Sequence, residues 1–318
     1  MMMFFKRHVP TLVLSVCLSV FLPQFAFAES PPPNAKQPDS KSLVIGKISS
    51  NPKKHYKFLK PIADYAVSKM SDLGYSHAQV VMAKDNEEMA AFLRAGKVDW
   101  VTETPFSAMI LKNSARAELL LRKWKKQVPE YHTVFFARRD SGIESLSDLE
   151  GKVVAFQDDG STTAYYIPAY LLIQNGQSLA RMPSHTHKPD AGDVGYLFAG
   201  KEINMSTWVH KGIVDAAAFS NLDWHKNDRT PEFFRKDFVI FHQSHSFPRA
   251  IELVRKDLPH EVKTRLKEVL LKIHEDPSAK DVLKAYQKTK KFDRITPDML
   301  SVLEETDSII SIVDKTLN

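Results

Sequence analysis

Near the start of the chain, a mostly continuous apolar run is followed by apolar residues at helical spacing. Leu43–Ile48 is a mostly apolar run of the length typical of a buried parallel strand, and apolar side chains then recur at helical spacing as far as Met70. Gly74 is the expected end of that helix. Further strands are expected at Ala78–Met82 and 96–102, each followed by a helical pattern. This alternation predicts a parallel sheet, and ligands bind such sheets beyond the carboxyl ends of the strands.

A second series of strands and helices begins at Lys152–Gln157, which is predicted to be a buried strand. We expect a loop at 183–193 and helical structure from there to about Lys211. The segment 212–220 repeats the pattern of 96–102, in which Gly, Val and Asp lead into a strand. The remaining expected elements are strands at Glu118–Trp124, Tyr131–Arg138, Asp237–His242 and Ala250–Val254 and helices at His260–Ile273, Ser278–Tyr286 and Pro297–Ile312. The repetition predicts two similar α/β lobes.

The N-terminal residues have the composition of a secretory signal. Lys6 and Arg7 form a basic region, Val9–Phe21 is mostly apolar, and Ala26–Ala28 is an A-x-A cleavage site. The apolar run is too short for a membrane-spanning helix. We therefore expect residues 1–28 to be a cleaved signal and the mature chain to lie in the bacterial periplasm.

The segment after the signal is expected to be a disordered linker, because Glu29–Ser40 is rich in proline. Cys17 is the only cysteine and lies within the signal, so the mature chain offers no thiol, no disulfide and no cysteine-based metal site. The residues before Cys17 match a lipobox imperfectly, because Val16 stands where Gly or Ala is expected. We do not expect a lipid anchor there.

Composition and charge limit the classes of function. The chain has 318 residues, 43% hydrophobic and 26% charged, which is a globular composition and a length that suits two domains. Its formal net charge of +6 becomes +4 once Lys6 and Arg7 leave with the signal, since residues 1–28 contain no acids. We interpret this mild excess as scattered, solvated lysines; the alternative is a preference for anionic small molecules. No polybasic run marks a nucleic-acid interface, and we expect no nucleic-acid partner.

Hydroxyl side chains gather where the helix after Lys152–Gln157 is expected to begin. Ser161, Thr162 and Thr163 directly follow a turn that contains Gly160. A helix N-terminus presents free N–H groups and a partial positive charge, and Ser and Thr add hydroxyl donors. Two interpretations remain open from this stretch alone: an oxyanion-binding site, or an ordinary Ser N-cap that closes a strand-to-helix turn.

Several motifs, in the right order, carry a resemblance to a known family. They are Gly96–Trp100, Ser145–Phe156, Asp159–Tyr165 followed by Pro168, and Gly212–Ala218. From about residue 43 to 293, the chain resembles the PhnD-like periplasmic substrate-binding proteins of phosphonate, phosphite and phosphate ABC transporters. The resemblance implies the α/β, two-lobe fold of type II periplasmic binding proteins, and it favours the oxyanion-binding interpretation of the turn.

The resemblance also implies how the lobes are arranged along the chain. Lobe one is expected to hold residues 41–137 and 241–318 and lobe two residues 138–240, joined by crossing strands near Phe135–Arg138 and Val239–His242. A small anionic ligand of the phosphonate or phosphate class would lie between the lobes. A membrane permease would then recognise the form in which the hinge has closed over the ligand. We expect a monomer with no cofactor and no enzymatic activity.

The family pattern implies ligand contacts on both lobes. The expected contact residues are Ser161, Thr162, Thr163, Tyr56, Glu103, Thr104, Ser107 and Asn221. Tyr56 resembles an aromatic residue that the family places over the ligand, with a core position as its alternative. Glu103 departs from the family pattern, since a carboxylate repels a dianion. It can instead accept a proton from a monoprotonated oxyanion, pair with a ligand amino group, or point away.

Polar residues late in the chain also have two interpretations. Asp215, Ser220, Asn221 and Asp223 either contact the organic part of the ligand or cap helices. Arg249 is interpreted as a partner in a surface ion pair rather than as a ligand clamp.

Other functions remain as alternatives. One is a signalling module that presents the bound anion to a sensor, and another is a binding protein for a non-phosphorus small molecule. The histidines lack the spacing of zinc motifs, so we expect no metal site. The sequence contains no GxSxG, P-loop or GxGxxG motif, which argues against an enzyme on the same fold.

Overall fold

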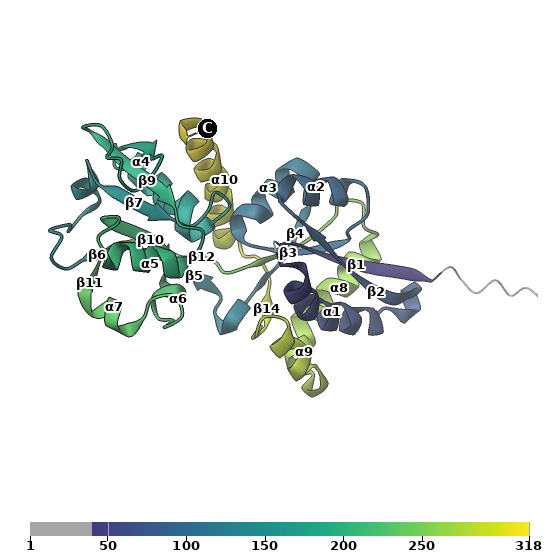
Figure 1. Cartoon of the computed structure of the whole chain (residues 1–318). Helices are drawn as coiled ribbons and strands as arrows, with labels where there is room; N and C mark the ends of the chain where they lie inside the picture. The colour runs from purple at the N-terminus through teal and green to yellow at the C-terminus, as the bar shows by residue number, and fades with distance from the viewer. Residues whose placement is uncertain (1–39, 50, 318) are drawn as a thin grey trace, which may run out of the picture. The chain divides into compact units, whose positions relative to one another are not determined.

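The structure is a computed structural model that describes residues 40–49 and 51–317. The predicted signal 1–28, Cys17 and all but the last residue of the predicted linker 29–40 lie outside the described residues. The described chain folds into two α/β lobes, each built on its own six-stranded sheet (Figure 1). The predicted fold class is confirmed. No described helix has the length and apolar character needed to cross a membrane.

The first sheet has the strand order β14-β4-β13-β3-β1-β2. Its strands are β1 (Lys41–Ile48), β2 (Tyr75–Ala83), β3 (Trp100–Glu103), β4 (Glu118–Lys123), β13 (Ile251–Val254) and β14 (Phe292–Asp293). β1 lies between β2 and β3 and, as predicted for a parallel sheet, runs parallel to both. β13 pairs antiparallel with β3 and β4. The helices of these parts of the chain are α1 (Pro52–Ser68), α2 (Asn86–Arg94), α3 (Pro105–Ala115), α8 (His260–Lys272), α9 (Lys280–Ala285) and α10 (Pro297–Leu317).

The second sheet has the strand order β11-β6-β10-β7-β9-β8. Its strands are β6 (Thr133–Arg138), β7 (Val153–Phe156), β8 (Ser178–Arg181), β9 (Asp193–Phe198), β10 (Ala216–Ser220) and β11 (Phe238–Gln243), and its helices are α4 (Ile167–Gln174), α5 (Glu202–His210), α6 (Asn221–Trp224) and α7 (Glu232–Asp237). The expectation of helix directly after residue 193 is wrong, because β9 occupies the start of that stretch. Val194, Tyr196 and Phe198 recur at period two, but so short an apolar run fits a strand or a helix equally well.

The repeated Gly, Val and Asp pattern has the same structural role in both lobes. Asp99 Oδ2 accepts a hydrogen bond from Val44 N at 2.9 Å, and Asp99 N donates to Val44 O at 2.9 Å. Asp215 Oδ2 accepts from Val153 N at 2.8 Å, and Asp215 N donates to Val153 O at 2.9 Å. Asp99 therefore fixes β1 beside β3, and Asp215 fixes β7 beside β10. In both cases the second strand begins directly after the aspartate and runs parallel to the first.

The two strands that were expected to cross between the lobes both belong to the second sheet. β6 and β11 pair antiparallel with each other, and β6 also pairs with β10. A separate antiparallel pair, β5 (Glu130–Tyr131) and β12 (Phe247–Pro248), comes just before β6 and just after β11 along the chain. We propose that this short pair marks the crossings. The sequence could not show where the chain crosses between the lobes. β6 is buried along almost its whole length, and such a strand looks the same in sequence whether it crosses between the lobes or belongs to the second sheet.

The C-terminal helix α10 contributes to the core of the second lobe. It packs against both α3 and α4. Ile309 and Val313 of α10 are buried in one cluster with Phe135 and Phe156 of the second sheet. Leu303 of the same helix is buried in a cluster with Val101 and Met109 of the first lobe, so α10 packs on both lobes, and the assignment of residues 241–318 to lobe one stays a prediction.

A buried ion pair crosses the middle of the first sheet. Lys123 Nζ of β4 lies 3.4 Å from Glu252 Oε1 of β13, and both side chains are fully buried. Glu252 also accepts hydrogen bonds from Trp100 Nε1 at 2.5 Å, Thr102 Oγ1 at 2.9 Å and the Tyr286 hydroxyl at 3.0 Å. Burial lowers the pKa of Lys123 to about 8, and the carboxylate of Glu252 opposes this shift. The pair therefore joins three adjacent strands and the chain after α9.

We predict that Lys123→Met lowers the free energy of unfolding by about 3–5 kcal/mol, because it leaves the carboxylate of Glu252 buried without a cation. Urea unfolding measures the change. Lys60→Met is the matched control, since Lys60 pairs with Asp64 on the exposed face of α1 and such pairs contribute at most about 1 kcal/mol. Equal losses in the two variants would contradict the prediction.

Candidate functional site

The turn after β7 leads into a helix that begins irregularly. Gly160 N donates to Asp158 Oδ1 at 3.0 Å, and Ser161 Oγ donates to Gln157 Oε1 at 3.0 Å. The first helical turn, Thr162–Tyr166, is a π-helix that continues directly into α4. The predicted strand, turn and helix are confirmed, whereas nothing in the sequence marked the π-helix. Such turns are rare and frequently occur at functional sites.

Thr162 places a hydroxyl in the interior without a partner. The residue is 3% exposed, and its Oγ1 makes no hydrogen bond with any described residue. The neighbouring Thr163 is fixed through its backbone, since Thr133 Oγ1 donates to Thr163 O at 2.9 Å. A buried, unpaired polar group costs about 1–3 kcal/mol. A ligand acceptor that reached Thr162 Oγ1 would remove this cost.

The side chains of Arg249 and Tyr131 pack against each other. The guanidinium of Arg249 stands over the Tyr131 ring, 4.5 Å from its centroid, and Arg249 Nε is buried without a partner among the described residues. Burial raises the pKa of the Tyr131 hydroxyl, while the charge of Arg249 and the adjacent Thr162 hydroxyl oppose the shift. Two unpaired donors, Thr162 Oγ1 and Arg249 Nε, therefore adjoin one tyrosine; we call these three residues the anion site.

The interpretation of Arg249 as a partner in a surface ion pair is wrong. Arg249 directly follows β12, and its backbone N donates to Pro129 O at 2.7 Å. This bond continues the β5–β12 pairing and places the guanidinium over Tyr131. No described carboxylate forms an ion pair with it. No local pattern indicated this position of Arg249, because the pairing joins segments more than 100 residues apart.

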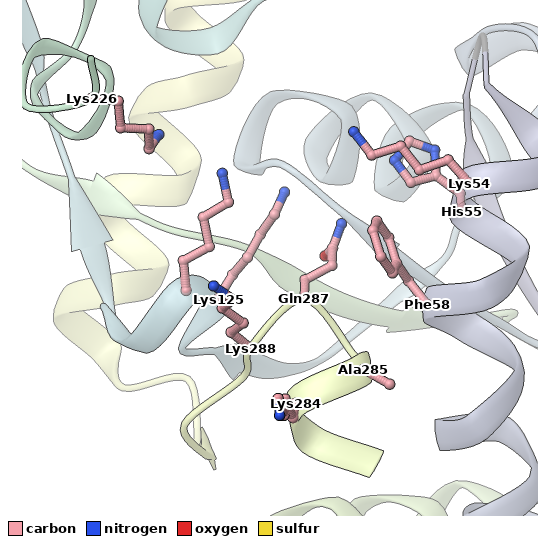
Figure 2. A pocket seen from close by; sticks show the side chains of 10 residues that line it. Lys54, His55, Phe58, Lys125, Lys226, Lys284, Ala285, Gln287 and Lys288 are labelled. Atoms are coloured by element: carbon pink, nitrogen blue, oxygen red, sulfur yellow. The ribbon is translucent and has the colours of Figure 1, made fainter. Parts of the chain in front are cut away.

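A cavity of about 660 Å³ is lined mostly by lysines. Its lining residues are Lys54, His55, Phe58, Lys125, Lys126, Lys226, Lys284, Ala285, Gln287 and Lys288, and we call it the lysine cavity. Figure 2 shows Lys54 and His55 reaching in from α1, Lys226 from the opposite side, and Lys125 and Gln287 between them. Contrary to expectation, the lysines are not scattered here, because the fold gathers them from distant segments, although four of the six are exposed to solvent, as expected.

The positive groups of this region act on one another. Burial lowers the pKa of Lys125 well below its usual range, and the charges of Arg249 and Lys47 lower it further. Burial also lowers the pKa of Lys126, with Lys226 and Arg249 as the next causes. The charge of Arg249 therefore acts on two lysines that line the cavity. A bound anion would relieve the repulsion among these groups.

His55 is held neutral by the same surroundings. Its Nδ1 forms a hydrogen bond with the Ser49 hydroxyl. Burial lowers the pKa of His55 to about 4, and the charges of Lys47, Lys125 and Lys54 add to the shift. At neutral pH the imidazole is therefore an uncharged group at the wall of a positive cavity.

The predicted residues after β3 are already engaged within the protein. Glu103 Oε2 forms an ion pair with Lys47 Nζ at 3.1 Å, and Glu103 Oε1 accepts from Ile48 N at 2.7 Å. Thr104 precedes α3 and Ser107 lies in its first turn, and both are half-buried. Contact of Glu103, Thr104 or Ser107 with a ligand stays a prediction.

Tyr56 and Asn221 differ in their surroundings. Tyr56 is 47% exposed, so its alternative interpretation as a core residue is wrong. Asn221 Oδ1 accepts from His132 N at 3.1 Å, which fixes α6 beside the start of β6. Ser220 caps α6 by accepting from Asp223 N at 3.2 Å, as one of the two interpretations predicted. Ligand contacts by Tyr56 and Asn221 remain predictions.

Sequence reasoning missed Tyr131 and the lysine cavity. The available signals were two basic runs, Lys123–Lys126 and Lys288–Lys291, which supply three of the lining lysines. Nothing in the sequence placed these two runs together. Among residues 40–49 and 51–317, no three His, Asp or Glu side chains gather in a group that could hold a metal ion.

We predict that His55 makes stability depend on pH. An ordinary histidine of the unfolded chain takes up a proton below a pH of about 6.5, whereas folded His55 takes one up only near pH 4. The unfolded state therefore binds more protons between these values, and the wild type should lose stability relative to His55→Gln as pH falls from 7 to 5. Urea unfolding of both proteins at both pH values checks this. An unchanged difference between the two proteins would count against it.

Known proteins resemble this chain over most of its length. XAC2383 from Xanthomonas citri, in structures with bound chloride and with bound ATP, is 38% identical; each match has a TM-score of 0.82 and covers 99% of that protein and 86% or 87% of this chain. The phosphate-import protein PhnD of Mycolicibacterium smegmatis is 23% identical over 222 residues, 68% of this chain and 67% of that protein.

A third relative supports the fold alone. PhnD1 from Prochlorococcus marinus, in complex with methylphosphonate, is 16% identical with a TM-score of 0.62, over 86% of this chain and 99% of that one.

The family model described as "ABC transporter, phosphonate, periplasmic substrate-binding protein" matches residues 47–300. The chain therefore belongs to the family of periplasmic substrate-binding proteins of phosphonate ABC transporters.

Proposed function

We propose that this protein binds a small oxyanion of the phosphonate or phosphate class and delivers it to a membrane permease. The observation that carries the proposal is the pair of buried, unpaired donors, Thr162 Oγ1 and Arg249 Nε, beside Tyr131. A tetrahedral oxyanion offers several acceptor oxygens and can satisfy both donors at once. Hydrogen bonds to charged oxygens are the stronger kind, at about 1.5–3 kcal/mol each.

The charges around the anion site favour an anion over a neutral or cationic ligand. The two acids that act on the lysines of the cavity, Glu103 and Asp223, are paired with Lys47 and Lys226. Side-chain bonds with Lys226 and Ser220 keep the pKa of Asp223 below its usual range, although burial alone would raise it. Glu103 and Asp223 are thus neutralised within the protein, and the lysines of the cavity without an acidic partner leave an excess of positive charge there.

The positions of these residues support binding by hinge closure. Thr162 follows β7 of the second sheet, Arg249 follows β12 between the sheets, and Lys54 lies on α1 beside the first sheet. A ligand that touches all three gains contacts in the closed form that the open form lacks, which shifts the population toward closure. A permease would then recognise the closed form.

Family membership and the relatives support the same ligand class and location. The relative from Mycolicibacterium smegmatis is a phosphate-import protein. Periplasmic location follows from the family, and we propose that residues 1–28 are the cleaved signal that leads there. The group that distinguishes phosphonate from phosphate would be bound by the predicted contacts after β3, around Glu103 and Ser107.

We predict that Thr162→Val weakens binding of inorganic phosphate and of methylphosphonate about 10-fold to 100-fold, because the hydroxyl donor is lost while side-chain volume is kept. Isothermal titration calorimetry measures both affinities. Thr264→Val, an exposed position on α8, is the matched control and should bind both anions as the wild type does. A wild-type protein that binds neither anion, or a Thr162→Val protein with unchanged affinity, would overturn the proposal.

A further inference from the structure

We infer that the lysine cavity is a subsite for the additional phosphoryl groups of a ligand whose terminal phosphoryl group occupies the anion site. This inference rests on the proposed function and deepens it: the ligand class becomes a chain of condensed phosphoryl groups. Such a chain of phosphoryl groups occurs in two kinds of ligand, an inorganic polyphosphate and a nucleoside polyphosphate.

The size of the cavity exceeds the needs of a single tetrahedral anion. Its volume of about 660 Å³ falls among pockets that hold drug-sized ligands, about 300–1,000 Å³. Phosphate and methylphosphonate each have only five non-hydrogen atoms. A ligand that ended at the anion site would leave the lysine cavity to water.

The charge of the cavity also exceeds what one phosphoryl group can neutralise. Of the six lining lysines, Lys226 is paired with Asp223, and the other five form no ion pair with any described residue. A terminal phosphoryl group carries about two negative charges near neutral pH, and each further phosphoryl group adds another. Even with Lys125 left out, because its pKa lies well below its usual range, the other four lysines exceed the charge of one phosphoryl group, and a chain of three groups matches them better.

Two strained turns present the lysines to the cavity. Lys126, Gln127, Gln287 and Lys288 have φ of 56°, 73°, 58° and 55°, and they are four of the five described non-glycine residues in the left-handed region. The turns support each other, since Lys126 N donates to Gln287 O at 3.1 Å and Gln127 Nε2 donates to Lys288 O at 2.7 Å. Backbone strain of this kind clusters where ligands are bound.

Arg249 connects the cavity with the anion site. It stands over Tyr131, and its charge acts on Lys125 and Lys126, which line the cavity. Phosphoryl groups that continue from the anion site past Arg249 would therefore meet these two lysines next. Guanidinium groups bind phosphate oxygens with two parallel hydrogen bonds, which suits a residue at this junction.

The test compares inorganic phosphate, pyrophosphate and tripolyphosphate by calorimetry at one fixed ionic strength. We expect the wild type to bind tripolyphosphate at least 10-fold more tightly than phosphate. Lys126→Gln/Lys288→Gln should remove most of this preference and leave phosphate affinity within about threefold. Lys211→Gln/Lys256→Gln removes two exposed charges elsewhere and should leave both affinities within about threefold. If the first variant does not fold, Lys284→Gln, on helix α9, replaces it.

The outcomes separate this inference from the proposed function. Phosphate binding without a preference for tripolyphosphate, or an equal loss of both affinities in Lys126→Gln/Lys288→Gln, overturns the subsite and leaves the proposed function standing. Binding of no anion at all overturns the proposed function. Thr162→Val should weaken the binding of phosphate and of tripolyphosphate alike. A tripolyphosphate affinity that this substitution leaves unchanged also overturns the subsite. UTP that binds as tightly as tripolyphosphate supports a nucleotide source, and weaker UTP binding supports an inorganic one.

Discussion

The buried ion pair between Lys123 and Glu252 fixes the part of the first lobe on which the site depends. Glu252 sits at the centre of three adjacent strands and also binds the Tyr286 hydroxyl, so it joins the sheet to the chain after α9. Lys123 Nζ lies 3.2 Å from Gln287 Oε1, which lines the lysine cavity. The same buried charges that hold the sheet together thus position one wall of the cavity.

The distribution of acids explains why this region can bind an anion. Glu252 neutralises Lys123, Glu103 neutralises Lys47, and Asp223 neutralises Lys226. These three carboxylates, which lie beside the lysines of the first sheet and of the cavity, are therefore each bound to a lysine. Positive charge remains on Arg249 and on the lysines that have no acidic partner, and it is this remainder that a ligand would meet. The pairing of charges across this region, rather than any single residue, therefore determines that the region can bind an anion.

Local patterns predicted the features that depend on neighbouring residues. The strands β1 and β7, the helix that begins at Thr162, and the repeated aspartates Asp99 and Asp215 could all be found from spacing and composition. The crossings between lobes could not, because a fully buried strand such as β6 gives no sign of the sheet to which it belongs. The lysine cavity could not be predicted either, since its lysines come from segments that only the tertiary fold brings together.

The central claim is that Thr162 and Arg249 bind one oxyanion together. A crystal structure of the mature protein with bound inorganic phosphate tests it most directly. We expect phosphate oxygens within hydrogen-bond distance of both Thr162 Oγ1 and Arg249 Nε. Phosphate bound elsewhere, with these two atoms still unpaired, would contradict the claim.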